Sequence, residues 1–166
     1  MSDYDCTEDV KNHQEAVQWY MRDIAFRLIE RARIHDASKL EQPEKALFDK
    51  WTPELKVRTF GTEYYKQALD EMGEGIKHHY AQNRHHPEHF DNGVDDMTLV
   101  DVIEMFCDWC AAAERNRVAL DIDHAKERFN LSDQLFHILI NTLIDNDIWN
   151  EIGGTQKIYL TPPKYR

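Results

Sequence analysis

The chain has 166 residues and a formal net charge of −11, with 42% of its residues hydrophobic and 31% charged. This length can bury a core without disulfides or a structural metal, so a metal bound here is expected to serve function. The charge opposes binding to a nucleic-acid duplex or an anionic membrane, because both require a basic footprint. A small phosphorylated substrate is still compatible, since metal ions invert the local field of an acidic pocket.

Helical spacing of apolar residues runs through almost the whole chain and predicts a single all-α domain, a bundle of six to seven helices over residues 1–166. Thr7 is the expected N-cap of the first helix, Gly73 and Gly75 weaken a central one, and Pro87 disfavours helical geometry at His86. The expected helices cover residues 7–33, 38–51, a restart at 52–54, 63–85, 99–120, 121–129 and 132–146, before a short extended C-terminal segment at 157–160.

Two features predict a protein of a reducing cytoplasm. The first residues lack the basic and apolar segments of a signal peptide, and no apolar run approaches the length of a membrane span. The cysteines number three, which is odd and argues against a disulfide framework. Cys107 and Cys110 have no second ligand pair and no neighbouring strand, so we predict small core residues rather than a zinc or redox site.

His35 and Asp36 form an adjacent pair just past the first helix, and both side chains are common ligands of first-row divalent metals. Such a pair can hold one ion from a single backbone segment or bridge two ions. A surface turn is the alternative, because His-Asp dipeptides also occur by chance. His13 lies in the apolar stripe of the first helix, where it is either a rigidly placed ligand or a core histidine with one hydrogen bond.

Five histidines gather in the middle of the chain, at positions 78, 79, 85, 86 and 89. We favour His79, with His85 or His86, as inward-facing ligands, because a helix and a turn fixed by proline bracket them. The spacing does not separate His78 from His79. A solvated surface with incidental metal affinity is the alternative, and it best accounts for His89.

Three carboxylates, those of Asp101, Glu104 and Asp108, interrupt an otherwise apolar run at residues 99–113 and share one narrow stripe of the predicted helix. Carboxylates on a helix buried nearly all round are costly unless cations or donors meet them. Bound metal ions could neutralise these carboxylates, and Arg115 on the same stripe is expected to neutralise part of their negative charge. The alternative is a buried network of ion pairs with basic residues such as Arg22, Arg27 or Arg31.

The order of His13, the His35-Asp36 pair, the central histidines and Asp108 resembles the HD-domain superfamily of metal-dependent phosphohydrolases, which is all-helical. Residues 35–39 look like the HDxxK form of its motif, and residues 108–115 are similar to the closing aspartate segment of the HD-GYP branch. No Gly-Tyr-Pro follows His86, so cyclic-dinucleotide hydrolysis does not carry over. The whole chain also resembles a group of small phage and bacterial proteins with HDxSK, HHPE and DWxAA segments.

The resemblance implies a site with one or two divalent ions, and it does not distinguish Mn, Fe, Co, Zn, Ni and Mg. The core ligands it implies are His13, His35, Asp36 and Asp108, and a second ion would be completed by His79 with His85 or His86. Lys39 would face the substrate phosphate, and Glu104 would orient a ligand or relay a proton. Further candidates for contact with the substrate are Asn83 and Arg115.

The expected activity is hydrolysis of a phosphate ester, either a nucleotide or another small phosphorylated metabolite, by metal-activated water. Two alternatives stay open. One is a di-iron oxygenase, because some HD-fold oxygenases share the pattern of HD and lysine. The other is a non-catalytic protein that binds a nucleotide or a partner. We expect the protein in the cytoplasm of a bacterial cell, phage-encoded or not, with an oligomeric state left open.

Overall fold

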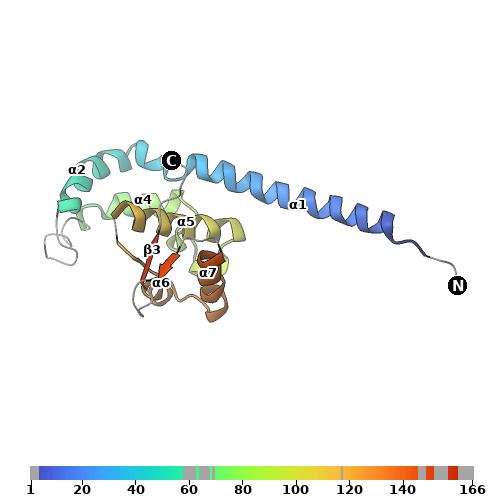
Figure 1. Ribbon diagram of the computed structural model, residues 1–166. Coiled ribbons are helices and arrows are strands. Elements are labelled where there is room, and N and C mark those ends of the chain that lie inside the picture. The colour runs from blue at the N-terminus through green and yellow to red at the C-terminus, as the bar shows by residue number, and fades with distance from the viewer. Residues whose placement is uncertain are drawn as a thin grey trace. The chain divides into compact units, whose positions relative to one another are not determined.

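Figure 1 shows the computed structural model, which describes residues 4–57, 63, 68, 70–116, 118–145, 149–151 and 157–160. The chain divides into two compact units, Met1–His35 and Asp36–Arg166, and each is described by itself. Helices dominate the described residues, so the predicted all-α class is confirmed. The single domain expected over residues 1–166 stays a prediction.

The first unit consists of one long helix, α1 (Thr7–Ile34), close to the predicted bounds. Thr7 is not its N-cap. Cys6 occupies that position, and Thr7 instead donates from its backbone N and its hydroxyl to Asp5 Oδ1, at 3.0 and 2.6 Å. Glu8 and Asp9 in the first turn complement the helix dipole. No residue of α1 is buried, because a lone helix cannot cover its own side chains.

Within its described residues, the second unit contains five α-helices, three short 3-10 helices and three strands. In chain order they are η1 (Ala37–Leu40), α2 (Glu44–Val57), α4 (Gly73–Gln82), η2 (Pro87–His89), η3 (Gly93–Asp96), α5 (Leu99–Asn116), β1 (Leu120–Asp121), α6 (Ile122–Phe129), α7 (Asp133–Asp145), β2 (Trp149–Glu151) and β3 (Lys157–Leu160).

Four predicted helix bounds are wrong. The helix predicted to begin at residue 38 begins at Glu44, because Ala37–Leu40 form the separate 3-10 helix η1. α2 continues through Pro53 to Val57, so no new helix begins at residue 52. α4 ends at Gln82 because Asn83 is extended, with a φ of −118°, and the next residues form a connecting segment. α5 ends at Asn116, and Leu120 belongs to strand β1. Part of the helix predicted at residues 63–85 lies outside the described residues.

The three strands form one small antiparallel sheet in the order β1-β3-β2. Leu120 pairs with Ile158, and Trp149 pairs with Leu160. The extended segment predicted at residues 157–160 is therefore confirmed as β3. The sequence does not predict its two partner strands, because runs of two and three residues are too short to show alternation.

The main core lies between α5, α6 and α7. Met105 on α5, Ile122 on α6 and Leu143 on α7 are each at most 1% exposed. A smaller core joins α2 to the start of α4, where Trp51 packs with Ala68 and Met72. These two cores hold the elements that carry the polar cluster described below.

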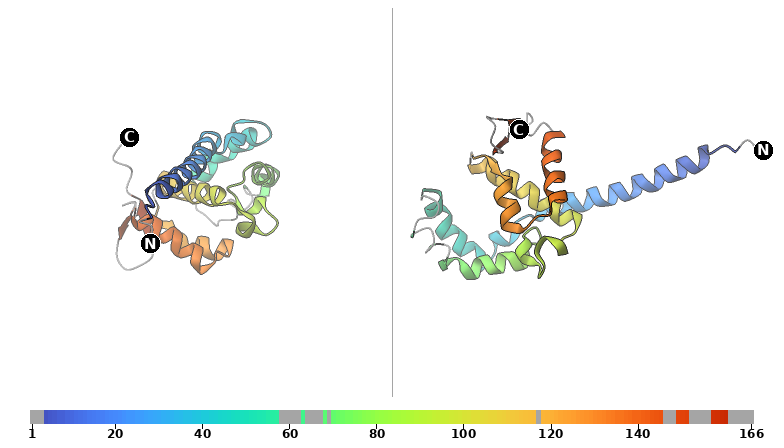
Figure 2. Two further views of the ribbon diagram at one scale, coloured as in Figure 1. Left: turned by 90° about the vertical axis from the view of Figure 1, so that its right-hand side faces the viewer. Right: turned by 90° about the horizontal axis from the view of Figure 1, so that it is seen from below.

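α2 and α4 pack side by side (Figure 2), and Gly75 permits their close approach. A Cβ atom on Gly75 would lie 2.5 Å from Leu47 Cδ1, so any other residue would require the Leu47 side chain to move. Glycine weakens a helix by its own propensity, but here it allows tight packing. The packing brings Glu44, the first residue of α2, into contact with the histidines of α4.

Candidate metal centre

Asp36 stands at the start of η1 with a left-handed backbone, at φ 57° and ψ 16°. Aspartate tolerates this conformation better than most residues, because its short polar side chain can bond locally. Lys39, one turn later on η1, brings its Nζ to 2.5 Å from Asp36 Oδ2. The lysine therefore holds one carboxylate oxygen and leaves Oδ1 directed toward two histidines.

His79 approaches Asp36 from α4 and is 3% exposed. Its Nδ1 lies 2.8 Å from Glu44 Oε2, and its Nε2 lies 3.2 Å from Asp36 Oδ1. An ionised carboxylate only accepts hydrogen bonds, so Glu44 favours the tautomer with the proton on Nδ1. The lone pair of Nε2 then faces Asp36. The structure also separates His79 from His78, whose side chain is 38% exposed.

His85 repeats this arrangement from the segment after α4. It is 2% exposed, and its Nδ1 lies 3.3 Å from Glu104 Oε1 on α5. Its Nε2 lies 3.6 Å from Asp36 Oδ1 and 4.0 Å from Asp108 Oδ2. Two buried histidines thus each turn Nδ1 to a buried carboxylate and Nε2 to the same oxygen of Asp36.

His86 completes the group from the residue before Pro87, where its backbone is extended as predicted. Its Nε2 lies 2.9 Å from His79 Nε2, and its ring centroid is 4.1 Å from that of His85. Burial, together with the neighbouring charges of His85 and His79, lowers the pKa of His86 to about 3. The imidazole is therefore neutral at neutral pH, as a metal ligand must be.

The four residues fit a divalent ion. Asp36, His79, His85 and His86 each offer one ligand atom, and these atoms lie within 4.8 Å of one another. Ligands about 2.1 Å from a common tetrahedral ion are roughly 3.4 Å apart, close to the spacings between Asp36 Oδ1 and the histidine nitrogens. Three imidazoles and a carboxylate suit Zn, Fe, Co, Ni or Mn better than Mg, which prefers oxygen. We call these four residues the histidine cluster.

The low pKa of His86 has a consequence for stability: the metal-free protein is expected to become less stable as the pH falls from 6.5 toward 3. Within this window the unfolded chain takes up a proton at His86, whose ordinary pKa is 6.5, and the folded chain does not until about 3. The unfolded state then binds more protons, so the free energy of unfolding falls by at most about 1.4 kcal/mol per pH unit.

Urea unfolding with a chelator at about pH 7 and about pH 5 measures this dependence. His86→Gln should flatten the pH dependence, whereas His137→Gln, at an exposed position on α7, should leave it unchanged. Equal slopes in the two variants would show that the pKa of His86 is not lowered.

Glu44 is the residue of the site that sequence reasoning missed. It is fully buried, and its carboxylate is 2.7 Å from His78 Nδ1, 2.8 Å from His79 Nδ1 and 2.9 Å from Ser38 Oγ. Burial acts to raise the pKa of Glu44, but the hydrogen bonds from His78, Ser38 and His79 outweigh it and lower the pKa. An acidic residue at the start of a predicted helix is usually solvated, so no sequence signal marks it.

Asn83 supports the same network. Its Nδ2 donates to Ser38 Oγ at 2.7 Å and to the backbone oxygen of His79 at 2.8 Å. Asn83 therefore has a structural role, because it ties η1 to the end of α4, and its contact with a substrate stays a prediction. This link fixes Asp36 and His79 relative to each other.

The carboxylates of α5 have different interaction partners. Asp101 is fully buried and forms two hydrogen bonds with Arg84, at 2.9 and 3.2 Å. The ion-pair alternative thus holds for Asp101, but with an arginine that the sequence does not single out. Arg27, one of the partners considered, pairs with Asp23 of its own helix at 2.8 Å. Glu104 orients His85, as described above, which matches the role expected for it.

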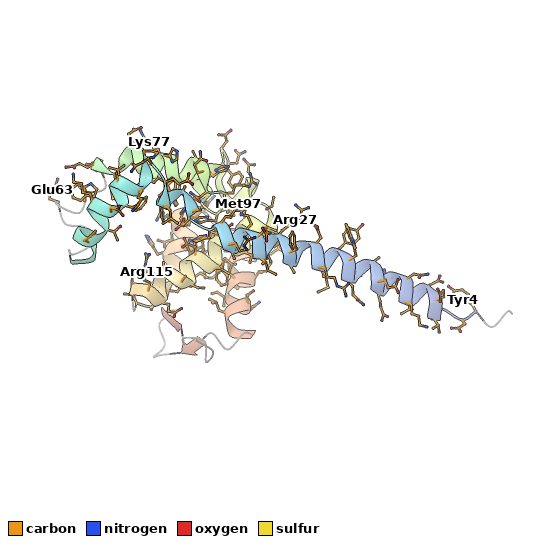
Figure 3. The ribbon with its side chains drawn as sticks, turned by 90° about the horizontal axis from the view of Figure 1, so that it is seen from above. Tyr4, Arg27, Glu63, Lys77, Met97 and Arg115 are labelled. Atoms are coloured by element: carbon orange, nitrogen blue, oxygen red, sulfur yellow. The ribbon has the colours of Figure 1, made fainter. Side chains whose placement is uncertain are left out.

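Arg115 does not belong to the pocket next to the histidine cluster. It is exposed near the C-terminal end of α5 (Figure 3), and Arg128 of α6 is the arginine among the described residues that line the pocket. The contact of Arg115 with a substrate stays a prediction. Spacing along one helix placed Arg115 on the stripe of Asp108, but only Asp108 of these two residues lines the pocket.

His13 and His35 belong to the first unit. His13 is exposed on α1, and His35 is the residue that follows the helix, directly before Asp36 in the chain. Their roles as ligands stay predictions. His89, by contrast, bonds through Nδ1 to the backbone oxygen of Tyr80 at 2.9 Å, in keeping with its exclusion from the expected ligands.

The two cysteines of α5 are not both core residues. Cys107 is exposed and Cys110 is half-buried, so the core prediction is wrong for Cys107. Partial desolvation by neighbouring atoms, together with the charge of Glu104, raises the pKa of Cys107, and burial raises the pKa of Cys110 to about 12. Both side chains therefore stay protonated at neutral pH and are poor nucleophiles.

Residues 2–145 match the model of a protein family described as a family of unknown function (DUF5662), and the chain belongs to this family. Neither the curated proteins nor the solved structures contain a significant match to the chain. Among the helices that the structure describes, none combines the length and apolar character needed to cross a membrane.

Proposed function

We propose that this chain is a metal-dependent hydrolase of small phosphate esters. The observation that carries the proposal is the paired geometry of His79 and His85. Each turns Nδ1 to a buried carboxylate and Nε2 to Asp36 Oδ1, at 3.2 and 3.6 Å. Pairs of carboxylate and histidine are the usual support of metal-binding imidazoles, because the carboxylate fixes the tautomer and the ring orientation.

The residues that would hold the ion are those of the histidine cluster, with His35 and Asp108 as the further ligands that the HD resemblance implies. A divalent ion held there lowers the pKa of bound water and neutralises charge on the phosphoryl oxygens. The sequence resemblance to HD phosphohydrolases supports phosphate-ester hydrolysis as the reaction.

Residues around the ion would orient its ligands, bind the phosphate and accept a proton. Glu44 and Glu104 keep the Nδ1 protons of His79 and His85 in place, so both Nε2 atoms stay available. Lys39 holds Asp36 and is 33% exposed, so its ammonium group can also reach a phosphate oxygen at the edge of the cluster. Asp108 lines the adjoining pocket and can accept a proton from a water or a substrate hydroxyl there.

The test measures metal and activity together. Protein purified without a chelator or an affinity tag should contain about one or two equivalents of a transition metal by elemental analysis. It should also release phosphate from members of a panel of nucleotides and sugar phosphates in the presence of Mn, Co or Mg. His79→Gln should lower both metal content and activity by more than about 100-fold, whereas the exposed His137→Gln should change neither.

Two results would overturn the proposal. Iron with an oxygen-dependent visible absorption, and no phosphate release, would point to an oxygenase instead. Tight binding of metal and nucleotide without turnover across the whole panel would point to a binding protein.

A further inference from the structure

A pocket of about 370 Å³ adjoins the histidine cluster within the second unit. His86 and Asp108 line it at the end next to the cluster, and α6 supplies much of the opposite wall. Its volume falls in the range of about 300–1,000 Å³ that is usual for sites of small molecules. A substrate whose reacting group lies at the cluster would therefore extend its remaining part into this pocket.

Small apolar side chains and an aromatic pair line much of the pocket. Ala112 lies one turn beyond Asp108 on α5, and Ala125 of α6 belongs to the same lining. Trp109 and Phe129, also in the lining, form a stacked pair with centroids 5.4 Å apart and an interplanar angle of 8°. Small side chains leave room for a ligand, and aromatic side chains favour a flat apolar group.

Two exposed polar residues, Asn116 and His124, also line the pocket, and each can donate or accept a hydrogen bond. The polyol part of a sugar phosphate would place several hydroxyls against the apolar side chains without partners, which is costly. A heterocyclic ring can lay its flat faces on the apolar side chains and offer its polar edge to the exposed polar residues, so the lining favours such a ring.

The charged side chains that line the pocket favour a ligand with a single phosphate over one with a polyphosphate chain. Among the described residues that line it, Arg128 is the one with a guanidinium group, and it already donates to Glu88 at 2.9 Å. Asp108 and Asp121 contribute carboxylates to the same lining. A polyphosphate chain would meet more negative than positive charge, whereas a single phosphate at the cluster would leave an uncharged group in the pocket.

We infer that this pocket binds the nucleoside part of a nucleoside monophosphate, with the base against Ala112 and the aromatic pair and the phosphate directed to the histidine cluster. The inference rests on the proposed function for the placement of the phosphate. The recognition of the nucleoside, however, depends only on the pocket, so it can be measured without turnover.

The experiment uses the full chain with its metal and compares two neighbouring alanines of α5. Ala112 lines the pocket, whereas Ala111 is exposed and does not. Calorimetric titration with the common nucleosides and their 5′-monophosphates should show binding of at least one pair, and weaker or no binding of glycerol 3-phosphate. Ala112→Leu should weaken nucleoside binding by at least about 10-fold, and Ala111→Leu should leave it unchanged.

Asn116→Ala, at an exposed position of the lining, provides a second variant that should fold normally and weaken nucleoside binding several-fold. No nucleoside binding at millimolar concentration, or equal binding by the Ala112→Leu and Ala111→Leu variants, would overturn the inference. Metal-dependent release of phosphate from glycerol 3-phosphate in that case would leave the hydrolase proposal standing. Nucleoside binding without any phosphate release would support the pocket and contradict the hydrolase.

Discussion

Asp36→Asn is expected to lower the metal affinity of the protein by more than about 100-fold, with a similar loss of phosphate release. Asp36 Oδ1 is the atom toward which both His79 and His85 turn Nε2, at 3.2 and 3.6 Å. Replacing the carboxylate removes a negative charge and leaves at best a weak neutral ligand among three imidazoles. A change at this one position therefore affects the contacts of both His79 and His85 within the histidine cluster.

Asparagine is the informative replacement because it tolerates the left-handed backbone of Asp36, at φ 57°. The lost ion pair with Lys39 joins partly exposed groups, so the free energy of unfolding should fall by less than about 1 kcal/mol. Asp49→Asn, which removes an exposed carboxylate that pairs with Lys45 at 2.7 Å, is the matched control. Retention of metal by the Asp36 variant, measured by elemental analysis and competition with a chelator, would remove Asp36 from the ligand set.

Glu44→Ala is expected to destabilise the metal-free protein by about 3 kcal/mol. The carboxylate is fully buried and accepts from His78, His79 and Ser38 at 2.7–2.9 Å. Its removal leaves these donors without their common acceptor, and His79, which is 3% exposed, has little access to water. Urea unfolding should show the loss, and Glu74→Ala should show almost none, because Glu74 is 88% exposed and pairs only with Lys77 at the surface.

Glu44→Gln separates orientation from stability. Glutamine keeps the volume, but its amide can present a donor to His79 Nδ1, which favours the tautomer with the proton on Nε2. That tautomer cannot bind a metal through Nε2, so metal affinity should fall by about 10- to 100-fold while the fold is retained. A normal metal affinity in this variant would show that Glu44 supports only the packing of α2 on α4.

The predicted helices are confirmed where neighbouring residues alone determine the helix. The apolar spacing of residues 99–113, broken by Asp101, Glu104 and Asp108, predicted a helix that is confirmed as α5, which buries Asp101 and Glu104. The expectation that this helix is buried nearly all round is wrong, because Leu99, Cys107 and Ala111 are exposed. The effect of Pro87 on His86 is also local, because the proline ring restricts the residue before it. The end of α4 at Gln82 was harder to predict, since Asn83 leaves the helix to bond Ser38 from another element.

The chain's own sequence determined the all-α class, the short strand near its end and a set of metal-ligand candidates that includes Asp36 and His79 with His85 or His86. Side-chain chemistry and a period of 3.6 residues are local properties of the sequence, so they can be recognised without the fold. The tertiary structure alone separated His79 from His78 and decided which carboxylates orient the histidines. Glu44 reaches His79 across 35 positions of the chain, where α2 packs on α4. Contacts of that range depend on how helices pack, which no local pattern encodes.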